Sequence, residues 1–343
     1  SYGGLGRDAE LSMWRSIVVF DVMEDIRSML LANATNPKEA VGIFNEEWNL
    51  IQDALERMNF SMMEKQLSRT AERFRRIFVK RDPDKVPTIL LTGEIFVRRD
   101  AISRQYLMEN LAEKGFATIC SPITEWIHYS DYLVEKGLTG YQMTKMEKLV
   151  LMVRKKIMAR DEKRIKSILS RSDLVHAEPL NVKSIIENGA AYISPNMIGE
   201  AILTVGSSLS EVVSHTCGVI AIGPFGCMPN RISEAILNVA MNREGKLATD
   251  PNNESLRAIL TDMEDLPFLA IESDGSPFPQ LISAKLETFC MRAERLHDRM
   301  LAAGKEKKSK IVNILGSRPK NIEKVNLSVG LHNQGISRGQ AYY

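Results

Sequence analysis

Apolar positions recur at helical spacing through the first part of the chain. They fall at 13, 17, 20, 23, 26 and 30, and again at 43, 48, 51 and 55. This period predicts helices, and breaks at Asn36 and Asn59 divide the region into three of them. Asn36 precedes Pro37, a pair typical of a helix cap followed by a first-turn proline. We expect an N-terminal helical region over residues 1–85.

Four short apolar runs follow, each about the length of a buried strand. They span residues 88–92, 116–120, 218–223 and 267–272. Helical patterns lie between and after them, at 102–114, 199–213, 231–241 and 279–301. Alternation of strands and helices predicts a parallel sheet covered by helices. We therefore expect an α/β fold with an open, mostly parallel, four-stranded, Rossmann-like sheet over residues 86–303.

Two further segments interrupt or follow this pattern. A long helical pattern at 142–170 lies inside the second crossover and predicts a helical insertion at about 139–172 that packs as an added layer. Residues 304–343 begin with several lysines and continue without periodicity, so we expect a loose tail there. No repeat of the solenoid type is present in the sequence.

Composition narrows the class of protein. With 343 residues, 44% hydrophobic and 26% charged, the chain has ordinary globular usage, and its net charge of +2 creates no overall field for nucleic acid or membrane. A basic run at 154–166 also carries acidic residues, which favours a solvated face. Neither a signal peptide nor an apolar stretch of about 18 residues is seen, so we expect a reduced, cytoplasmic setting. The first residue is Ser, as expected for a processed or excised chain.

Polar side chains follow all four predicted strands. In open α/β sheets, ligands bind beyond the carboxyl ends of the strands, where helix N-termini present unpaired amides. Glu94 and Glu125 are candidates for acid–base chemistry or cation binding, and equally for capping the next helix. Arg98 and Arg99 are candidates for a phosphate or carboxylate clamp, with at least one of them expected as a surface ion-pair partner.

Cys227 is the most distinctive of the strand-end residues. It lies between Gly226 and a Met-Pro pair that should open a helix, where the positive dipole end favours a thiolate. Three roles of Cys227 stay open: a metal ligand, a nucleophile, or a small residue in a tight turn. Of the first two, metal ligation ranks ahead of nucleophilic catalysis. Cys120, Cys217 and Cys290 fall on buried positions, which predicts core packing. Because no CxxC pair exists, a zinc or four-iron site held by this chain alone is not expected.

Four segments resemble one protein family. They are LTGEIFVRRD at 91–100, residues 195–206, IGPFGCMP at 222–229, and residues 268–279. Together they are similar to the carboxyl-terminal part of the activase–dehydratase fusion proteins related to 2-hydroxyacyl-CoA dehydratases. The resemblance covers roughly residues 10–300. It implies a Rossmann-like lobe of the dehydratase D-component type, in which cysteines hold a [4Fe-4S] cluster between two lobes.

The resemblance also implies a reaction and its partners. In that family an ATP-dependent activase passes one electron to the cluster and on to an acyl-CoA thioester, so that a ketyl radical expels a hydroxyl group. Cys227 matches the motif cysteine and would be the cluster ligand, with Glu94, Arg98 and Glu125 lining the cavity. The other cluster ligands and the activase motifs do not occur in this sequence. We therefore expect an electron-accepting lobe that is inactive alone.

A second reading comes from a different functional class. The chain could instead be a non-catalytic scaffold lobe, whose helical layers dock the rest of a multidomain chain or a companion lobe. Such a lobe would hold no cluster and would expose an apolar patch where its neighbour is missing. An enzyme that uses Cys227 as a nucleophile ranks behind both readings.

Overall fold

Three helices precede the sheet, as predicted. The computed structural model describes residues 6–303 and contains α1 (Arg7–Asn33), α2 (Pro37–Glu56) and α3 (Phe60–Phe74). Asn36 caps α2 by accepting a hydrogen bond from the Glu39 amide, and Asn59 caps α3 in the same way. Both breaks predicted from the sequence are therefore helix caps.

A four-stranded parallel sheet follows. Its strands are β1 (Thr88–Gly93), β2 (Ala117–Cys120), β3 (Gly218–Pro224) and β4 (Phe268–Ser273), in the order β2-β1-β3-β4. In the register, Leu91 lies opposite Cys120 on one side and Ile220 on the other. All three strand pairings are parallel, which confirms the predicted fold class. The strand order changes direction between β1 and β3, the point where open α/β sheets form a crevice.

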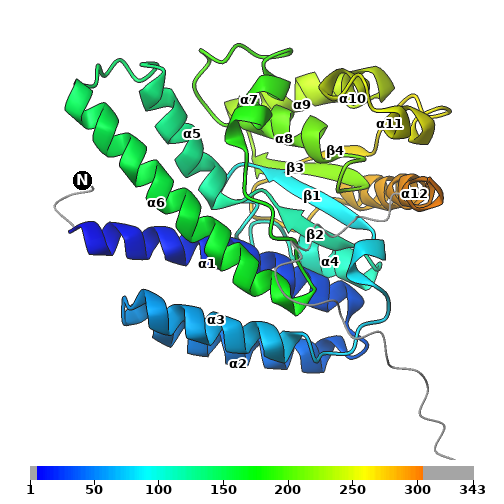
Figure 1. Cartoon of the computed structure of the whole chain (residues 1–343). Coiled ribbons are helices and arrows are strands. Elements are labelled where there is room, and N and C mark those ends of the chain that lie inside the picture. The colour runs from blue at the N-terminus through cyan, green and yellow to red at the C-terminus, as the bar shows by residue number, and fades with distance from the viewer. Residues whose placement is uncertain (1–5, 304–343) are drawn as a thin grey trace, which may run out of the picture. The chain divides into compact units, whose positions relative to one another are not determined.

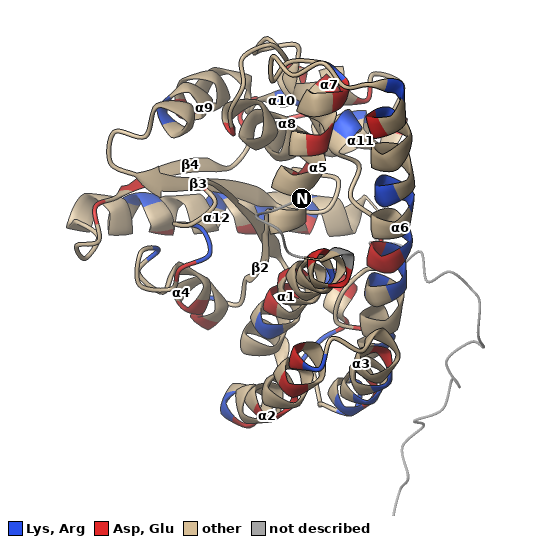
Figure 2. Cartoon of the chain, turned by 90° about the vertical axis from the view of Figure 1, so that its left-hand side faces the viewer, with Lys and Arg blue, Asp and Glu red and all other residues tan. Residues whose placement is uncertain are grey.

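Helices connect the strands and cover both faces of the sheet (Figure 1). α4 (Leu107–Glu113) joins β1 to β2, and the chain then passes through α5 (Ile123–Glu135), α6 (Lys145–Leu169), α7 (Val182–Gly189) and α8 (Ala201–Glu211) to β3. Between β3 and β4 lie α9 (Met228–Ala240), α10 (Arg243–Thr249) and α11 (Glu254–Ile259), and α12 (Gln280–Ala302) follows β4. α8 and α9 lie on one face, while α4 and α12 lie on the other (Figure 2).

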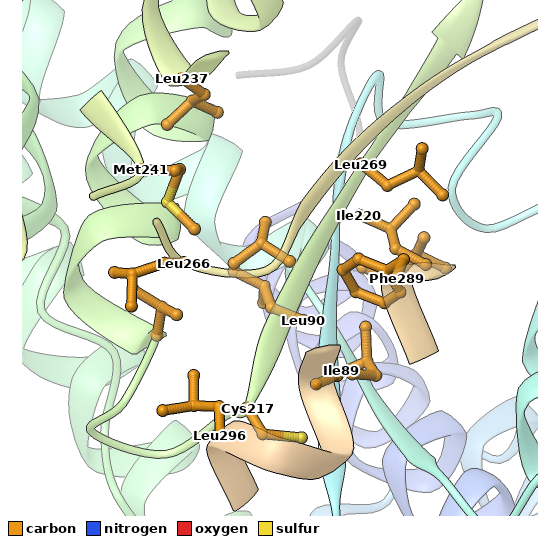
Figure 3. Close-up of a cluster of buried hydrophobic side chains, with 14 of the residues drawn as sticks. Ile89, Leu90, Cys217, Ile220, Leu237, Met241, Leu266, Leu269, Phe289 and Leu296 are labelled. Atoms are coloured by element: carbon orange, nitrogen blue, oxygen red, sulfur yellow. The ribbon is translucent and has the colours of Figure 1, made fainter. Parts of the chain in front are cut away.

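The largest hydrophobic core lies on both sides of the central strands. Every residue of β1 is buried, as expected of a strand with helices on both faces. Figure 3 shows Leu237 of α9 and Met241, which follows that helix, on one side of the sheet, and Phe289 of α12 on the other, near Ile89 and Ile220. This packing explains why the strands appear in the sequence as continuous apolar runs rather than alternating ones.

α1 covers the free edge of β2. Ser28 Oγ accepts a hydrogen bond from the Thr118 amide at 2.6 Å, and Asp25 accepts one from the Cys120 amide at 3.2 Å. Asp21 accepts from the Ile123 and Thr124 amides at the start of α5. These three residues lie on one face of α1, at spacings of four and three. The helix thereby satisfies an edge that would otherwise expose unpaired amides.

The inserted helix α6 packs against α1 and α3, as the sequence predicts for an added helical layer. Several ion pairs join it to the rest of the chain, among them Asp161 with Arg15 of α1 at 2.7 Å, and Glu162 lies 3.0 Å from His128 of α5. Trp14 donates a hydrogen bond to the Met158 carbonyl. Within residues 6–303, no helix has both the length and the apolar character needed to cross a bilayer.

Some helix boundaries differ from the prediction. The helix expected from residue 102 begins only at Leu107, because Gln105 and Tyr106 adopt positive φ angles of 51° and 53°. A helix cannot continue through left-handed residues. α9 begins at Met228 rather than 231, with Pro229 in its first turn. The tail expected at 304–343 lies outside the described residues.

Candidate functional site

The carboxyl ends of β1 and β3 meet at the strand-order switch point. The Glu94 amide donates a hydrogen bond to the Ile222 carbonyl at 2.9 Å. Gly93 has a φ of 107°, and a Cβ atom there would lie 2.1 Å from the Ile222 oxygen. Only glycine allows so close an approach of the two backbones. The glycine that ends β1 therefore fixes how the residues after it enter the crevice.

Arg98 braces the ends of two neighbouring strands. Its side chain is 4% exposed, and Nε donates to the Ser121 carbonyl at 3.0 Å while Nη1 donates to the Gly93 carbonyl. Arg99 is buried as well, with Asp21 at 2.9 Å and Glu24 as a second ion-pair partner. The expectation that one of these arginines is a surface ion-pair partner is wrong, because α1 packs over this edge of the sheet.

Glu94 acts as a cap. One oxygen of its carboxylate accepts hydrogen bonds from the Phe96 amide at 3.1 Å and the Val97 amide at 2.8 Å. Glu94 therefore caps the turn after β1 and not the next helix, as the capping alternative expected, because α4 begins only at Leu107. Glu94 also lies close enough to Glu200 for its negative charge to raise the pKa of that residue.

Glu125 is a buried carboxyl group in the first turn of α5. It is 2% exposed, and burial raises its pKa from 4.5 to about 7, against the opposing effect of the Arg98 charge. Glu125 can therefore hold or release a proton close to neutral pH, as a general acid or base must.

Glu200 is a third carboxyl group at this site, and the sequence analysis did not select it. It occupies the N-cap position of α8, and burial raises its pKa, with Arg98 opposing the change and Glu94 reinforcing it. Arg98 thus lies near Glu125 and Glu200 at once. The sequence signal that could have identified Glu200 is its position, since it lies at the start of the helix that leads into β3.

Cys227 lies at the same edge of the sheet. It is the N-cap residue of α9, and its amide donates to the Pro224 carbonyl at 3.1 Å. Of the four cysteines, it alone is partly exposed. The tight turn predicted from Gly226 and the helix start predicted from the Met-Pro pair are both present.

The other three cysteines are buried, as predicted. Cys120 donates to the Arg98 carbonyl, and burial raises the pKa of its thiol to about 12. Cys217 directly precedes β3, at the amino ends of the strands, and donates a hydrogen bond to the Thr88 carbonyl. Cys290 lies on α12, where burial raises its pKa to about 11. Burial thus favours the protonated thiols of Cys120 and Cys290, and Cys227 is the thiol placed to react or to ligate.

The donors present do not fit an iron–sulfur cluster held by this chain alone. Within the described part of the chain, no three His, Cys, Asp or Glu side chains gather in a way that could hold a metal ion. A [4Fe-4S] cluster usually takes four thiolates, and only Cys227 offers an accessible thiol at this edge. One thiolate fits a site that is completed by other chains or lobes.

Two polar side chains without hydrogen-bond partners and several exposed apolar side chains also lie at the carboxyl edge of the sheet. Ser121 Oγ and both amide atoms of Asn230 are buried without a hydrogen-bond partner among the described residues. Asn230 is 3% exposed and lies against Gly223 of β3, and Ser121 directly follows β2. Large apolar side chains beside them face solvent: Phe96 is 65% exposed, Phe225 78% and Met228 68%.

Comparison of the chain with protein-family models, with curated proteins and with solved structures gave no match.

Proposed function

We propose that the chain is one lobe of a two-lobe, iron–sulfur-dependent reductase of the 2-hydroxyacyl-CoA dehydratase type. In this proposal Cys227 supplies one thiolate to a [4Fe-4S] cluster shared with a companion lobe. An ATP-dependent activase would be the electron donor, and an acyl-CoA-type thioester the substrate. The setting would be the reducing cytoplasm, where exposed thiols persist.

The observation that carries the proposal is the contrast between the four thiols. Three are buried in the core, whereas Cys227 is accessible at a helix N-terminus beside the strand-order switch point. The amides and the positive dipole end of a helix N-terminus attract anionic ligands. The apolar residues around Cys227, among them Phe225 and Met228, would be covered by the companion lobe.

Glu125 and Arg98 suit the acid–base part of such a reaction. Loss of a hydroxyl group from carbon is easier when a proton is delivered to it, since the leaving species is then water rather than hydroxide. Glu125 has a pKa of about 7 and lies near the Arg98 charge, so it can carry that proton at neutral pH. Glu94 and Arg98 hold the loop after β1 in place.

The proposal is tested on the native complex, purified anaerobically through a tag on this chain. Iron, acid-labile sulfide and the visible spectrum are measured for the unchanged chain, for Cys227→Ala, and for Cys290→Ala, which removes a thiol far from this edge. We expect a brown complex that loses most of its iron and sulfide in Cys227→Ala and keeps it in Cys290→Ala. Equal iron in both variants would refute the role of Cys227.

A second candidate function is a non-catalytic scaffold lobe. It is favoured by the exposure of Phe96, Phe225 and Met228 around the crevice, an arrangement that fits a docking face as well as a shared site. In that case the native complex is colourless and iron-free even when purified anaerobically. The same measurements therefore separate the two functions.

A further inference from the structure

A groove with a strongly positive lining runs between α3 and α6, away from the crevice at the strand ends. Its volume is about 870 Å³, and six cationic side chains line it against a single carboxylate, that of Glu64. The cations are Lys65, Arg69, Arg160, Lys163, Arg164 and Arg171. Figure 2 shows Lys and Arg positions on the neighbouring parts of these two helices. The charge is local, since the whole chain carries only +2.

Helical spacing brings these cations to one place. On α3, Lys65 and Arg69 are four residues apart and share a face. On α6, Arg160 and Arg164 are likewise four apart, with Lys163 beside them. The two helices are in contact along this stretch. Their basic faces therefore form opposite walls of one groove.

Most of this positive charge is unpaired. Arg164 pairs with Glu64, and Arg160 pairs with its neighbour Asp161 at 2.9 Å. Lys65, Arg69, Lys163 and Arg171 form no ion pair with any acidic residue that the structure describes. Like charges four residues apart on a helix repel one another. Four exposed cations without acidic partners around one groove create a local positive potential that attracts anions.

We infer that this groove binds a small polyanion of the oligophosphate class, that is, a ligand carrying a diphosphate or triphosphate group. Its volume falls within the range of small-molecule sites, about 300–1,000 Å³. Lysine and arginine are the side chains that recognise phosphate, and Ser61, Ser68 and Ser167 add hydroxyl groups to the lining. Among the described residues that line the groove none is aromatic, so they offer no platform for the base stacking that single-stranded nucleic acid uses. This site is independent of the function proposed for the crevice.

Titration calorimetry on the full chain tests the inference, with inorganic tripolyphosphate and pyrophosphate as probes at about 0.05 M ionic strength, where charge interactions are weakly screened. We expect saturable binding with one site per chain. The double variant Arg69→Ala with Lys163→Ala removes one unpaired cation from each wall, and should weaken tripolyphosphate binding at least tenfold. The double variant should lose more affinity for tripolyphosphate than either single variant.

The matched control is Lys285→Ala with Arg295→Ala, which removes the same two residue types from exposed positions on α12. We expect less than a twofold change in this control. An equal loss in both double variants would mean that overall charge alone attracts the probe, and would overturn the site. So would the absence of any binding by the unchanged chain, or tight binding of a single-stranded RNA that tripolyphosphate fails to displace. Circular dichroism and melting temperature verify that each variant is folded.

Discussion

The buried Glu125 should make the chain less stable as pH rises. Its pKa is raised by burial from 4.5 to about 7, so between these values the folded chain keeps a proton that the unfolded chain releases. The free energy of unfolding therefore falls across this window. At about 1.4 kcal/mol per pH unit, the loss is about 3 kcal/mol once pH exceeds 7. Glu125→Gln has nearly the same shape, stays neutral, and should avoid this loss.

Urea denaturation from pH 4.5 to 8.5, followed by circular dichroism, measures the effect. We expect Glu125→Gln and the unchanged chain to be about equally stable at the acidic end, and the variant to be more stable by about 3 kcal/mol at pH 8. Glu56→Gln at the end of α2 removes one exposed carboxylate and serves as the control. A constant difference between Glu125→Gln and the unchanged chain at every pH would refute the reasoning.

Two further stability predictions concern the sheet. Gly93→Ala should cost about 3 kcal/mol or more, since its Cβ would lie 2.1 Å from the Ile222 oxygen at a positive φ; Gly115→Ala, also at positive φ but in open space, should cost only about 1–2 kcal/mol. Ser28→Ala should cost about 1–3 kcal/mol, because it leaves the Thr118 amide without its acceptor. Urea midpoints verify both, and equal costs for the two glycine variants or no cost for Ser28→Ala would contradict them.

The order of elements was predictable because each element carries a local signal. The four strands are continuous apolar runs, and all four lie within one or two residues of their predicted ends. Asn36 and Asn59 mark helix starts because their side chains cap the helices that follow. Such signals act within a few residues, so a single sequence reveals them.

The covering of the β2 edge by α1 could not be predicted. The residues that make it, such as Ser28 and Thr118, are 90 positions apart. Nothing in either segment alone specifies the other as its partner. The same holds for Arg104 and Glu24, an ion pair across 80 residues. For the same reason at least one of Arg98 and Arg99 was expected at the surface, since the burial of the Arg99 side chain depends on a helix from the far N-terminal region.

The position of the candidate site could be predicted from the sequence, but the hydrogen bonding and protonation of its carboxyl groups could not. Parallel strands direct their carboxyl ends to one edge, so Glu94, Arg98, Glu125 and Cys227 could be assigned to that edge from the order of elements. Whether a glutamate there is a cap or an acid depends on which amides reach it. Glu94 accepts hydrogen bonds from two backbone amides, whereas burial raises the pKa of Glu125.

The balance of charge at the crevice explains why a proton should stay there. Arg98 is the cation common to Glu125 and Glu200, and two of its donors already bind backbone carbonyls. One guanidinium shared between a buried and a partly buried carboxylate leaves an uncompensated negative charge, which is costly away from water. Taking up a proton removes that charge. Glu125, as the more deeply buried of the two, is the group that should take it.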